Sequence, residues 1–241
     1  MMLVDSFLVR DGRVVRPDLH RQRFEAAGGT YPDLRGSIPE RGEWFPRISG
    51  HLAGVDAAVD AGVDAGVDAV AEAATGVSVK LRPAPPLRSA TRLWIGPEED
   101  PRVVPQVKGP DLGVLAELRA RAVALGADDA LLYRGGVALE AANAAVMFID
   151  GGEAVLPPQG ETLLSTTVVA TLEAGLLPRV QRRQVSIAQA LRLPAFAASA
   201  LHGWTPVTHW IGAWGQVVAP RTEAFDAAAV NAALWEQATP L

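Results

Sequence analysis

The chain has 241 residues, 49% of them hydrophobic, a formal net charge of −5 at pH 7 and no cysteine. This length and composition suffice to bury a core, and the lack of cysteine excludes disulfides, thiolate nucleophiles and cysteine metal sites. The negative charge argues against a nucleic-acid or anionic-membrane partner. Residues 1–16 lack the apolar core of a signal peptide, and no apolar run approaches the roughly 20 residues that span a bilayer. We therefore expect a soluble cytoplasmic protein.

The first ninety residues predict short strands and one helix. Asp11-Gly12 is a hairpin turn signal, and Asp18 is placed to cap a helix that stops at Gly28-Gly29. The segment 31–43 is rich in Pro, Gly and charge, which predicts a loop. Strands are expected at 3–9, 14–15, 44–49 and 77–81, and the helix at 19–27.

A low-complexity tract runs from Val55 to Val70 and repeats every four residues. Four is close to the helical period of 3.6, so the valines would form one stripe. Gly62 and Gly66 disfavour a helix, and like charges four residues apart repel. A marginal surface helix and a mobile loop both remain open. The aspartates lack the loop pattern and closing glutamate of an EF-hand, so we expect no calcium site there.

The rest of the chain predicts a connection followed by alternating hairpins and helices. Residues 87–101, which contain Pro97-Glu98-Glu99-Asp100-Pro101, resemble an inter-domain connection. Gly126 and the turns at Gly135-Gly136 and Gly151-Gly152 divide the segments that follow. Helices are expected at 112–125, 166–174, 187–191 and 226–237, and strands at 130–133, 137–140, 144–149, 154–156, 179–185, 195–200 and 207–211.

This order of elements predicts a mixed α/β (α+β) fold rich in antiparallel hairpins. It lacks the regular strand-helix alternation of a doubly wound sheet, and no Gly-x-Gly-x-x-Gly follows a strand. We expect a small N-terminal α/β domain at 1–90 and a larger C-terminal domain at 91–241.

Lys108 is the leading candidate for covalent chemistry. It and Lys80 are the only lysines, although arginine is abundant. A lysine can lose its proton and act as an amine nucleophile, whereas a guanidinium stays charged. The alternative is that both lysines are ordinary solvated residues.

Three segments together carry a resemblance to a known family. They are Val107-Lys108-Gly109, then Gly126-Ala127-Asp128-Asp129-Ala130-Leu131-Leu132, then the strand from Leu139-Glu140 to Met147-Phe148. The succession resembles the class IV aminotransferases, which include branched-chain and D-amino-acid aminotransferases and 4-amino-4-deoxychorismate lyase. The resemblance implies fold type IV, a two-domain mixed sheet/barrel with helices. It also implies pyridoxal 5'-phosphate as cofactor, an amino-acid or amino-chorismate substrate and a homodimer.

The resemblance also implies roles for individual residues. Lys108 resembles the Schiff-base lysine, and Glu140 the carboxylate that faces the pyridine nitrogen. Arg23, in His20-Arg21-Gln22-Arg23-Phe24, resembles the arginine that binds the cofactor phosphate. Arg23 has an alternative as a helix arginine paired with a carboxylate, and Glu140 one as a solvated strand residue.

Further phosphate-side residues follow from the same resemblance. Ser165-Thr166-Thr167 opens a helix whose N–H groups and dipole suit a phosphate, so Thr166 and Thr167 are candidates, with plain helix capping as the alternative. Ala200, in Ser199-Ala200-Leu201-His202-Gly203, matches a phosphate-side turn. Asn143 stands on an apolar strand and is a candidate to line the site, with an edge or bulge position as the alternative.

The remaining polar residues have simpler interpretations. Arg47, Arg82 and Arg88 are candidates for a substrate carboxylate, with structural roles as the alternative. The histidines show no metal spacing, so no metal site is expected. Asp128-Asp129 is expected to be a solvated turn. Trp204, Trp210 and Trp214 are expected in a core or an interface.

Several functions are consistent with these residues. We favour a lyase of the aminodeoxychorismate type, because the run Glu140-Ala141-Ala142 resembles the small-residue strand of that branch. A branched-chain or D-amino-acid aminotransferase is the alternative. A degenerate, non-catalytic family member is another, because Ala145 stands where the family has Asn and the family's Gly-Asp-Gly segment has no counterpart before Asp5. An unrelated α/β protein with an incidental Lys108 is the last.

Overall fold

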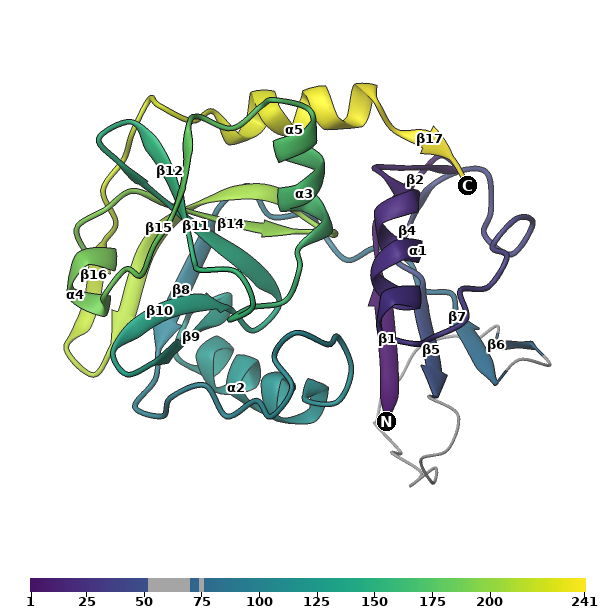
Figure 1. The fold of residues 1–241 in the computed structure, drawn as a ribbon, viewed down its shortest axis with the longest axis horizontal. Helices are drawn as coiled ribbons and strands as arrows, with labels where there is room; N and C mark the ends of the chain where they lie inside the picture. The colour runs from purple at the N-terminus through teal and green to yellow at the C-terminus, as the bar shows by residue number, and fades with distance from the viewer. Residues whose placement is uncertain (52–69, 74–75) are drawn as a thin grey trace.

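A six-stranded β-barrel forms the larger part of the molecule in the computed structural model, which describes residues 1–51, 70–73 and 76–241 (Figure 1). Its strands follow the order β10-β9-β8-β15-β14-β11, and β11 pairs back onto β10. The strands are β8 (Thr91–Ile95), β9 (Asp129–Arg134), β10 (Val137–Ala141), β11 (Ala144–Asp150), β14 (Ala195–Ser199) and β15 (Gly203–Gly212). β8 is parallel to both of its neighbours, and the other pairs are antiparallel, so the sheet is mixed.

Three strands extend the barrel sheet and four helices pack around it. They are β12 (Glu153–Leu156), β13 (Val180–Arg182) and β16 (Gly215–Val218), with α2 (Leu112–Ala124), α3 (Thr166–Glu173), α4 (Ile187–Ala190) and α5 (Ala227–Glu236). α2 lies along β9, and α3 and α5 lie along β14 and β15. Trp94 and Leu118 belong to one core cluster, which holds α2 to the outside of the barrel.

Alternation of side chains along β11 builds two cores from one strand. Val146 and Phe148 face the barrel interior, where Phe148 stacks on Trp210 with ring centroids 6.4 Å apart. Met147 and Ile149 face outward into a second core with α3 and α5. Because both faces of β11 are buried, its apolar run has no polar side.

The N-terminal part contributes two small antiparallel sheets beside the barrel (Figure 1). One has the order β1 (Met2–Ser6), β5 (Arg47–His51), β7 (Val77–Lys80), β6 (Val70–Ala73). The other has the order β17 (Thr239–Pro240), β3 (Arg13–Val14), β2 (Val9–Arg10), β4 (Glu43–Trp44). The helix α1 (Pro17–Ala26) lies between β1 and α3. The C-terminal strand thus returns to the N-terminal sheets, although the proposed boundary at residue 90 places it with the larger domain.

The expected connection at 87–101 is wrong, because it contains β8 in the middle of the barrel sheet. Leu93 and Ile95 point into the barrel core, and Trp94 packs under α2. The run Thr91–Ile95 is rich in β-branched and aromatic residues, which favour a strand. Its flanking prolines and acidic residues hid this signal.

The start of α1 also differs from the expectation. The helix begins at Pro17 after Arg16, which adopts a left-handed conformation with φ of 51°. Asp18 lies in the first turn, where its carboxylate pairs with Arg16 Nη2 at 2.6 Å. It therefore does not act as the N-cap. Proline at the first helical position loses no intrahelical hydrogen bond, which explains why the helix starts there.

Several other predicted elements agree with the structure only in part. The predicted strand 3–9 is broken into β1 and β2, because Leu8 N turns away to donate to Ala200 O at 2.9 Å. β16 and β17 were not predicted. The repeat from Val55 lies outside the described residues, except for its last residue in β6. Trp204 and Trp210 are in cores as expected, whereas Trp214 is 51% exposed.

Candidate functional site

The loop that carries Lys108 is fixed against the first strand. Val4 N on β1 donates to Lys108 O at 2.8 Å. The next residue, Gly109, has a φ of 155°, and a Cβ there would collide with the backbone carbonyl of Met2. Only glycine allows this close approach. The loop then enters α2, and Asp111 at the helix N-cap accepts from the backbone N–H groups of residues 103 and 104.

The Lys108 side chain points into a pocket and is 27% exposed. Its Nζ lies 4.0 Å from Asp5 Oδ1. Burial and the nearby charge of Arg23 lower the pKa of the Lys108 ammonium to about 8, against the opposing effect of Asp5. A substantial fraction of Lys108 is therefore the neutral amine near physiological pH, as a nucleophile requires.

Asp5 connects the lysine to Arg23 and His20. Arg23 Nη2 donates to Asp5 Oδ1 at 2.5 Å, and His20 Nδ1 lies 3.0 Å from Asp5 Oδ2. Burial alone would raise the pKa of the Asp5 carboxyl, but His20, Arg23 and Lys108 together hold it well below its usual range. Arg23 also donates to Leu164 O at 3.1 Å, which brings α1 to the start of α3.

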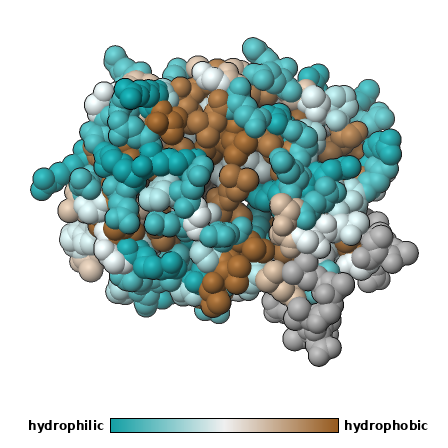
Figure 2. All heavy atoms as spheres, in the orientation of Figure 1, coloured by the Kyte–Doolittle hydropathy of each residue, from teal (hydrophilic) through white to brown (hydrophobic). Residues whose placement is uncertain are grey.

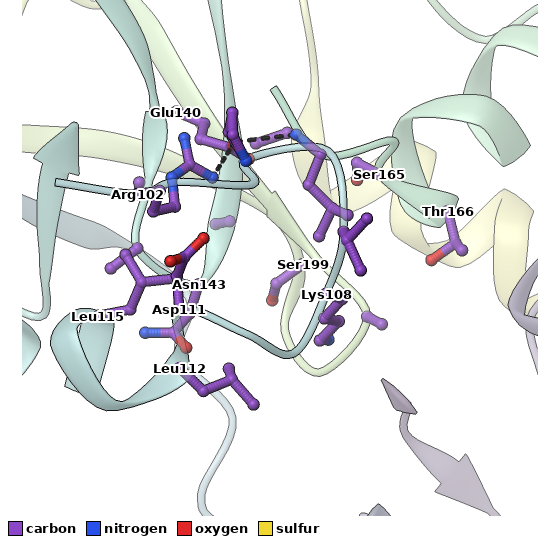
Figure 3. A pocket seen from close by; sticks show the side chains of 18 of the residues that line it. Arg102, Lys108, Asp111, Leu112, Leu115, Glu140, Asn143, Ser165, Thr166 and Ser199 are labelled. Atoms are coloured by element: carbon purple, nitrogen blue, oxygen red, sulfur yellow. Dashed lines mark hydrogen bonds and ion pairs between the residues drawn. The ribbon is translucent and has the colours of Figure 1, made fainter. Parts of the chain in front are cut away.

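Glu140 lies on the opposite side of the pocket, at the end of β10, and is buried. Its Oε1 accepts from Arg102 Nη1 at 2.6 Å and from Leu163 N at 2.9 Å. Arg102 is held in turn by two hydrogen bonds of 2.9 Å to Asp100. Burial raises the pKa of Glu140 to about 7, although Arg102 opposes the shift. Glu140 is therefore held in place by its hydrogen bonds, and its carboxylate is partly protonated near pH 7. It is not a solvated strand residue (Figure 3).

The start of α3 forms the third side of the pocket. Ser165 caps the helix by accepting from Val168 N at 3.3 Å. The first backbone N–H groups of a helix have no intrahelical partner and favour an anion. Thr166 lines the same pocket as Lys108 and Arg23. Thr167 lines the adjoining cavity with His20.

Asn143 and Ala200 lie on two turns at the pocket. Asn143 is in the tight turn between β10 and β11, and its backbone N–H donates to Asp129 Oδ2 at 3.0 Å. Asp129 is buried, and burial raises its pKa, so the expected solvated turn at Asp128-Asp129 is wrong for its second residue. Ala200 follows β14, and its carbonyl accepts from Leu8 N, which fixes the turn against the N-terminal part.

The structure brings six of the seven predicted site residues into one pocket, and Figure 3 labels four of them, Lys108, Glu140, Asn143 and Thr166. The six are Arg23, Lys108, Glu140, Asn143, Thr166 and Ala200. The seventh, Thr167, lies next to them in the adjoining cavity. Elements far apart in the sequence, α1, the loop before α2, β10 and α3, therefore meet around one small space.

Two residues of this site were not predicted. Asp5 gave a signal, because it is the only charged residue of a mostly apolar first strand. Arg102 gave none, since it stands among valines and prolines like an ordinary loop arginine. Both are buried and act by holding residues that were predicted, Arg23 and Glu140.

The pocket offers three kinds of group to a ligand. A guanidinium and a helix N-terminus at one end suit a phosphate-like dianion. A buried carboxylate at the other end suits a basic ring nitrogen, and the amine of Lys108 between them suits a carbonyl carbon. In the described ranges, no three acidic or histidine side chains are grouped to hold a metal ion. Nor does any described helix have the length and apolar character that crossing a membrane requires.

Comparison with known proteins gives a family and a fold. The family model for amino-transferase class IV matches residues 2–210. No curated protein matches this sequence. Similar solved structures include the pyridoxal-phosphate-bound form of a hypothetical aminotransferase from Mycobacterium tuberculosis, with a TM-score of 0.71 and 19% identity over 97% of this chain and 87% of that one.

Two further structures are similar at the level of the fold. A branched-chain aminotransferase from the archaeon Thermoproteus uzoniensis has a TM-score of 0.71 and 13% identity, over 98% of this chain and 84% of its own. A putative 4-amino-4-deoxychorismate lyase from Legionella pneumophila has a TM-score of 0.70 and 14% identity, over 98% and 90%. Both branches of the resemblance therefore share this architecture.

Proposed function

Because this chain belongs to the class IV aminotransferase family, whose members are pyridoxal-phosphate enzymes, we propose that it is a pyridoxal-phosphate-dependent enzyme acting through Lys108. The observation that supports this most is a single pocket in which a lysine of lowered pKa lies between an anion-binding end and a buried carboxylate. A surface lysine would have neither neighbour. Bound pyridoxal phosphate supplies an electron sink next to the substrate's alpha carbon.

The residues present fit this cofactor in the chemistry of their donors. Arg23 and the N-terminus of α3, with the hydroxyl of Thr166, would hold the phosphate. Glu140 would face the pyridine nitrogen with Oε2, the oxygen for which the structure gives no hydrogen bond to a described residue. Lys108 would bond to the aldehyde carbon. Small side chains at 141, 142, 144 and 145 leave room for a flat ring beside β10 and β11.

Different residues of the chain would then supply the base, the positioning contacts and the charge next to the ring nitrogen. Lys108 Nζ would be the base that takes the proton from the substrate carbon that bears the amine. Asp5 keeps Lys108 and Arg23 in place, because it contacts both and is buried beneath them. Arg102 opposes the effect of burial on the pKa of Glu140 and so favours its charged form, which is the form that would keep a ring nitrogen protonated.

Within the family we place the chain on the side of the aminodeoxychorismate lyase branch. The small-residue run after Glu140 supports this, and the similar Legionella structure carries that name. A branched-chain or D-amino-acid aminotransferase is the second candidate, favoured by the similar Thermoproteus uzoniensis enzyme. A lyase would release pyruvate from its substrate, whereas an aminotransferase would need a keto-acid acceptor for turnover.

Borohydride trapping tests the proposal. Purified protein is incubated with pyridoxal phosphate, reduced, digested and mapped by mass spectrometry, with Lys108→Ala as the control. Lys80 and the N-terminal amine are the only other amines of this kind, so the site of attachment is unambiguous. We expect the adduct on Lys108. No adduct, or one on Lys80 alone, would refute the enzymatic function and favour the non-catalytic alternative.

Turnover separates the two branches. Protein loaded with pyridoxal phosphate is given aminodeoxychorismate alone, and 4-aminobenzoate and pyruvate are measured. In parallel it is given L- or D-amino acids with a keto acid, and amino-group transfer is measured. Product without added keto acid supports the lyase, and transfer that requires keto acid supports the aminotransferase.

A further inference from the structure

A second and wider cavity opens on the other side of Lys108. It has a volume of about 550 Å³ and shares Lys108, Asn143, Ser199 and Ala200 with the cofactor pocket. A molecule in this cavity could therefore reach the lysine while a cofactor occupies the neighbouring pocket. The cavity is therefore a candidate for the substrate site, and the chemistry of its walls indicates which substrates would fit.

The walls of this cavity are cationic. Five basic side chains line it besides Lys108, and none of the described residues that line it is acidic. The five are Arg47, Lys80, Arg82, Arg88 and Arg119. They lie on two sides. The first three come from β5, β7 and the segment after it in the N-terminal part, and the last two lie before β8 and on α2.

In the part of the chain that the structure describes, Arg88 differs from the other cations of this wall in having a buried side-chain nitrogen whose hydrogen bond is unmade. Its Nε is buried and has no hydrogen-bond partner among the described residues. Its Nη1 donates to the carbonyl of Asp128 at 3.2 Å, and no described carboxylate lies within ion-pair distance of it. A guanidinium partly removed from water is costly unless a negative charge accompanies it.

The two carboxylates that act electrostatically on Arg88, those of Asp128 and Asp129, are hydrogen-bonded to other groups. Asp128 accepts from Arg92 N at 2.8 Å and from Arg92 Nε at 3.2 Å. Asp129 accepts from the backbone N–H groups of Ala130 and Asn143. Neither of the two carboxylates lines the cavity. Both carboxylates therefore act on Arg88 only through space, and its guanidinium forms no direct ion pair with a described residue.

Two neighbours complete an anion site around Arg88. Arg119 on α2 lines the cavity, is exposed and has no ion pair with any residue of the described ranges. His202 Nδ1 accepts from Arg88 N at 3.3 Å, which places the ring proton on Nε2 as a donor. Burial and the charge of Arg88 lower the pKa of His202 to about 4, so the ring is neutral at pH 7.

We propose that this cavity binds an amino substrate with two carboxylates, and that Arg88 and Arg119, with His202, hold the carboxylate at the far end from the amine. Arg47, on the opposite wall, is available to the carboxylate nearer the amine. The inference rests on the proposed function in one respect, that the substrate amine reacts at the Lys108 side of the cavity. It disfavours substrates with an apolar far end, because they would leave the buried Nε of Arg88 without a partner.

Binding of unreactive acids tests this without turnover. Glutarate and pentanoate have the same chain length and differ by one carboxylate, and neither has an amine or a keto group. Their dissociation constants are measured by isothermal titration calorimetry at fixed salt, with protein that has been incubated with pyridoxal phosphate. We expect glutarate to bind roughly tenfold or more tightly than pentanoate, because its second carboxylate gives the partly buried Arg88 an ion-pair partner.

Variants assign the selectivity to residues. Arg88→Gln and Arg119→Gln should each weaken glutarate roughly tenfold and leave pentanoate within about twofold. Arg121→Gln is the matched control, because Arg121 lies on the same helix but pairs with Glu98 at 2.9 Å outside the cavity. If Arg88→Gln fails to fold, Arg119→Gln still decides, since that side chain is exposed.

The outcomes separate this inference from the proposed function. Equal binding of the two acids, or equal weakening of both by the variants, would overturn the dicarboxylate site even if Lys108 forms its adduct. Selective binding of glutarate without a Lys108 adduct would overturn the proposed function and support the anion site by itself.

Discussion

At the residue scale, Asp5 links the basic side chains of the site to one another. One buried carboxylate contacts Arg23 and His20 and lies 4.0 Å from Lys108 Nζ. A carboxylate in this position has two effects. It keeps two cations close together that would otherwise repel each other, and it raises the pKa of Lys108 against the effect of burial. The pKa of Lys108 is therefore lowered to about 8, so that part of the lysine is protonated and part is the neutral amine around that pH.

The first prediction concerns the pH dependence of cofactor attachment at Lys108. The neutral amine is the nucleophile, and the pKa of Lys108 is lowered to about 8. The rate of adduct formation should therefore rise about tenfold per pH unit below pH 8 and level off above it. Absorbance after mixing apoprotein with pyridoxal phosphate gives the rate. A midpoint near the ordinary lysine pKa of 10.5 would show that Lys108 is not desolvated.

The second prediction concerns Asp5→Asn. The folded-state pKa of Asp5 is lowered, so its charge stabilises the fold above the ordinary aspartate pKa of 3.8, and this contribution is lost as the pH falls below that value. At pH 7 the substitution should cost about 3–5 kcal/mol, because it leaves Arg23 without its buried partner.

Urea unfolding of wild type and Asp5→Asn at several pH values measures this difference. The difference in the free energy of unfolding between wild type and Asp5→Asn should become steadily smaller as the pH is lowered. Asp33→Asn is the control, because Asp33 also pairs with an arginine, Arg35, but at the surface. A difference that stays constant with pH would mean that the charge of Asp5 does not stabilise the fold.

The third prediction concerns Glu140→Gln. An amide cannot carry the charge that keeps a ring nitrogen protonated, and it leaves Arg102 with Asp100 alone. We expect kcat to fall by about 100-fold or more, whereas the Lys108 adduct still forms. Glu98→Gln, at a surface ion pair with Arg121, should leave kcat unchanged. Loss of the adduct together with kcat would point to a damaged fold and contradict the proposed role.

At the scale of elements, the site depends on how closely the Lys108 loop approaches β1. The contact is a backbone hydrogen bond from Val4 and a glycine that leaves no room for a side chain. β1 in turn carries Asp5, and α1 carries Arg23, so the approach of the loop sets the geometry of the whole cluster. The other side of the pocket depends on the N-terminus of α3.

The fourth prediction compares two glycines in this region. Gly109→Ala should destabilise the protein by about 2 kcal/mol or more, because its Cβ would collide with the backbone of β1. Gly113→Ala, four residues later in α2, meets no atom within 4 Å and should stabilise the helix by about 0.5–1 kcal/mol. Thermal unfolding measures both. The opposite order would show that the loop is not anchored to β1.

At the scale of the whole molecule, apolar side chains gather in a band down one face, over α3 and toward the loop before α2 (Figure 2). Leu164, just before α3, is 59% exposed, and Val103, in the loop before α2, is 85% exposed. Both residues flank the cofactor pocket. Exposed apolar surface of this kind marks an interaction site. We propose that this face joins two copies in a homodimer, as the family resemblance implies.

The fifth prediction tests that assembly. Sedimentation equilibrium at micromolar concentration should give twice the chain mass of 25.4 kDa. Val103→Glu and Leu164→Glu should shift the protein toward monomer, because they place a charge in the interface. Val218→Glu is the control, since Val218 is 67% exposed on β16, at the opposite side of the barrel in Figure 1. A monomeric wild type would refute the dimer.

Local signals were sufficient to predict most elements and to single out residues that line one pocket. Hairpin turns at paired glycines, a glycine that ends α2 and a serine that caps α3 follow from the sequence because each reflects a short-range steric or hydrogen-bonding rule. Lys108, Glu140 and Arg23 were found by motif and spacing. Their roles stay predictions until the chemistry is measured.

Contacts between segments far apart in the sequence decided the parts of the fold and of the site that local signals did not predict. β8 resembles a connection in the sequence because a central barrel strand is defined by its partners β9 and β15, which lie far along the chain. Asp129 was expected in solvent, yet the turn at Asn143 folds over it and buries it. Arg102 and Arg88 carried no signal, since nothing local distinguishes an arginine in a cavity wall from one on a surface.

The sequence by itself therefore determined which functional groups this protein has and the elements that carry them. Only the tertiary structure decided that Asp5 lies beneath Lys108, that Arg102 holds Glu140 and that the cavity beside the lysine is lined with cations. The reason is physical. Side-chain type and short-range periodicity are local properties, whereas burial, desolvation and the distance between charges arise only when segments separated along the chain pack together.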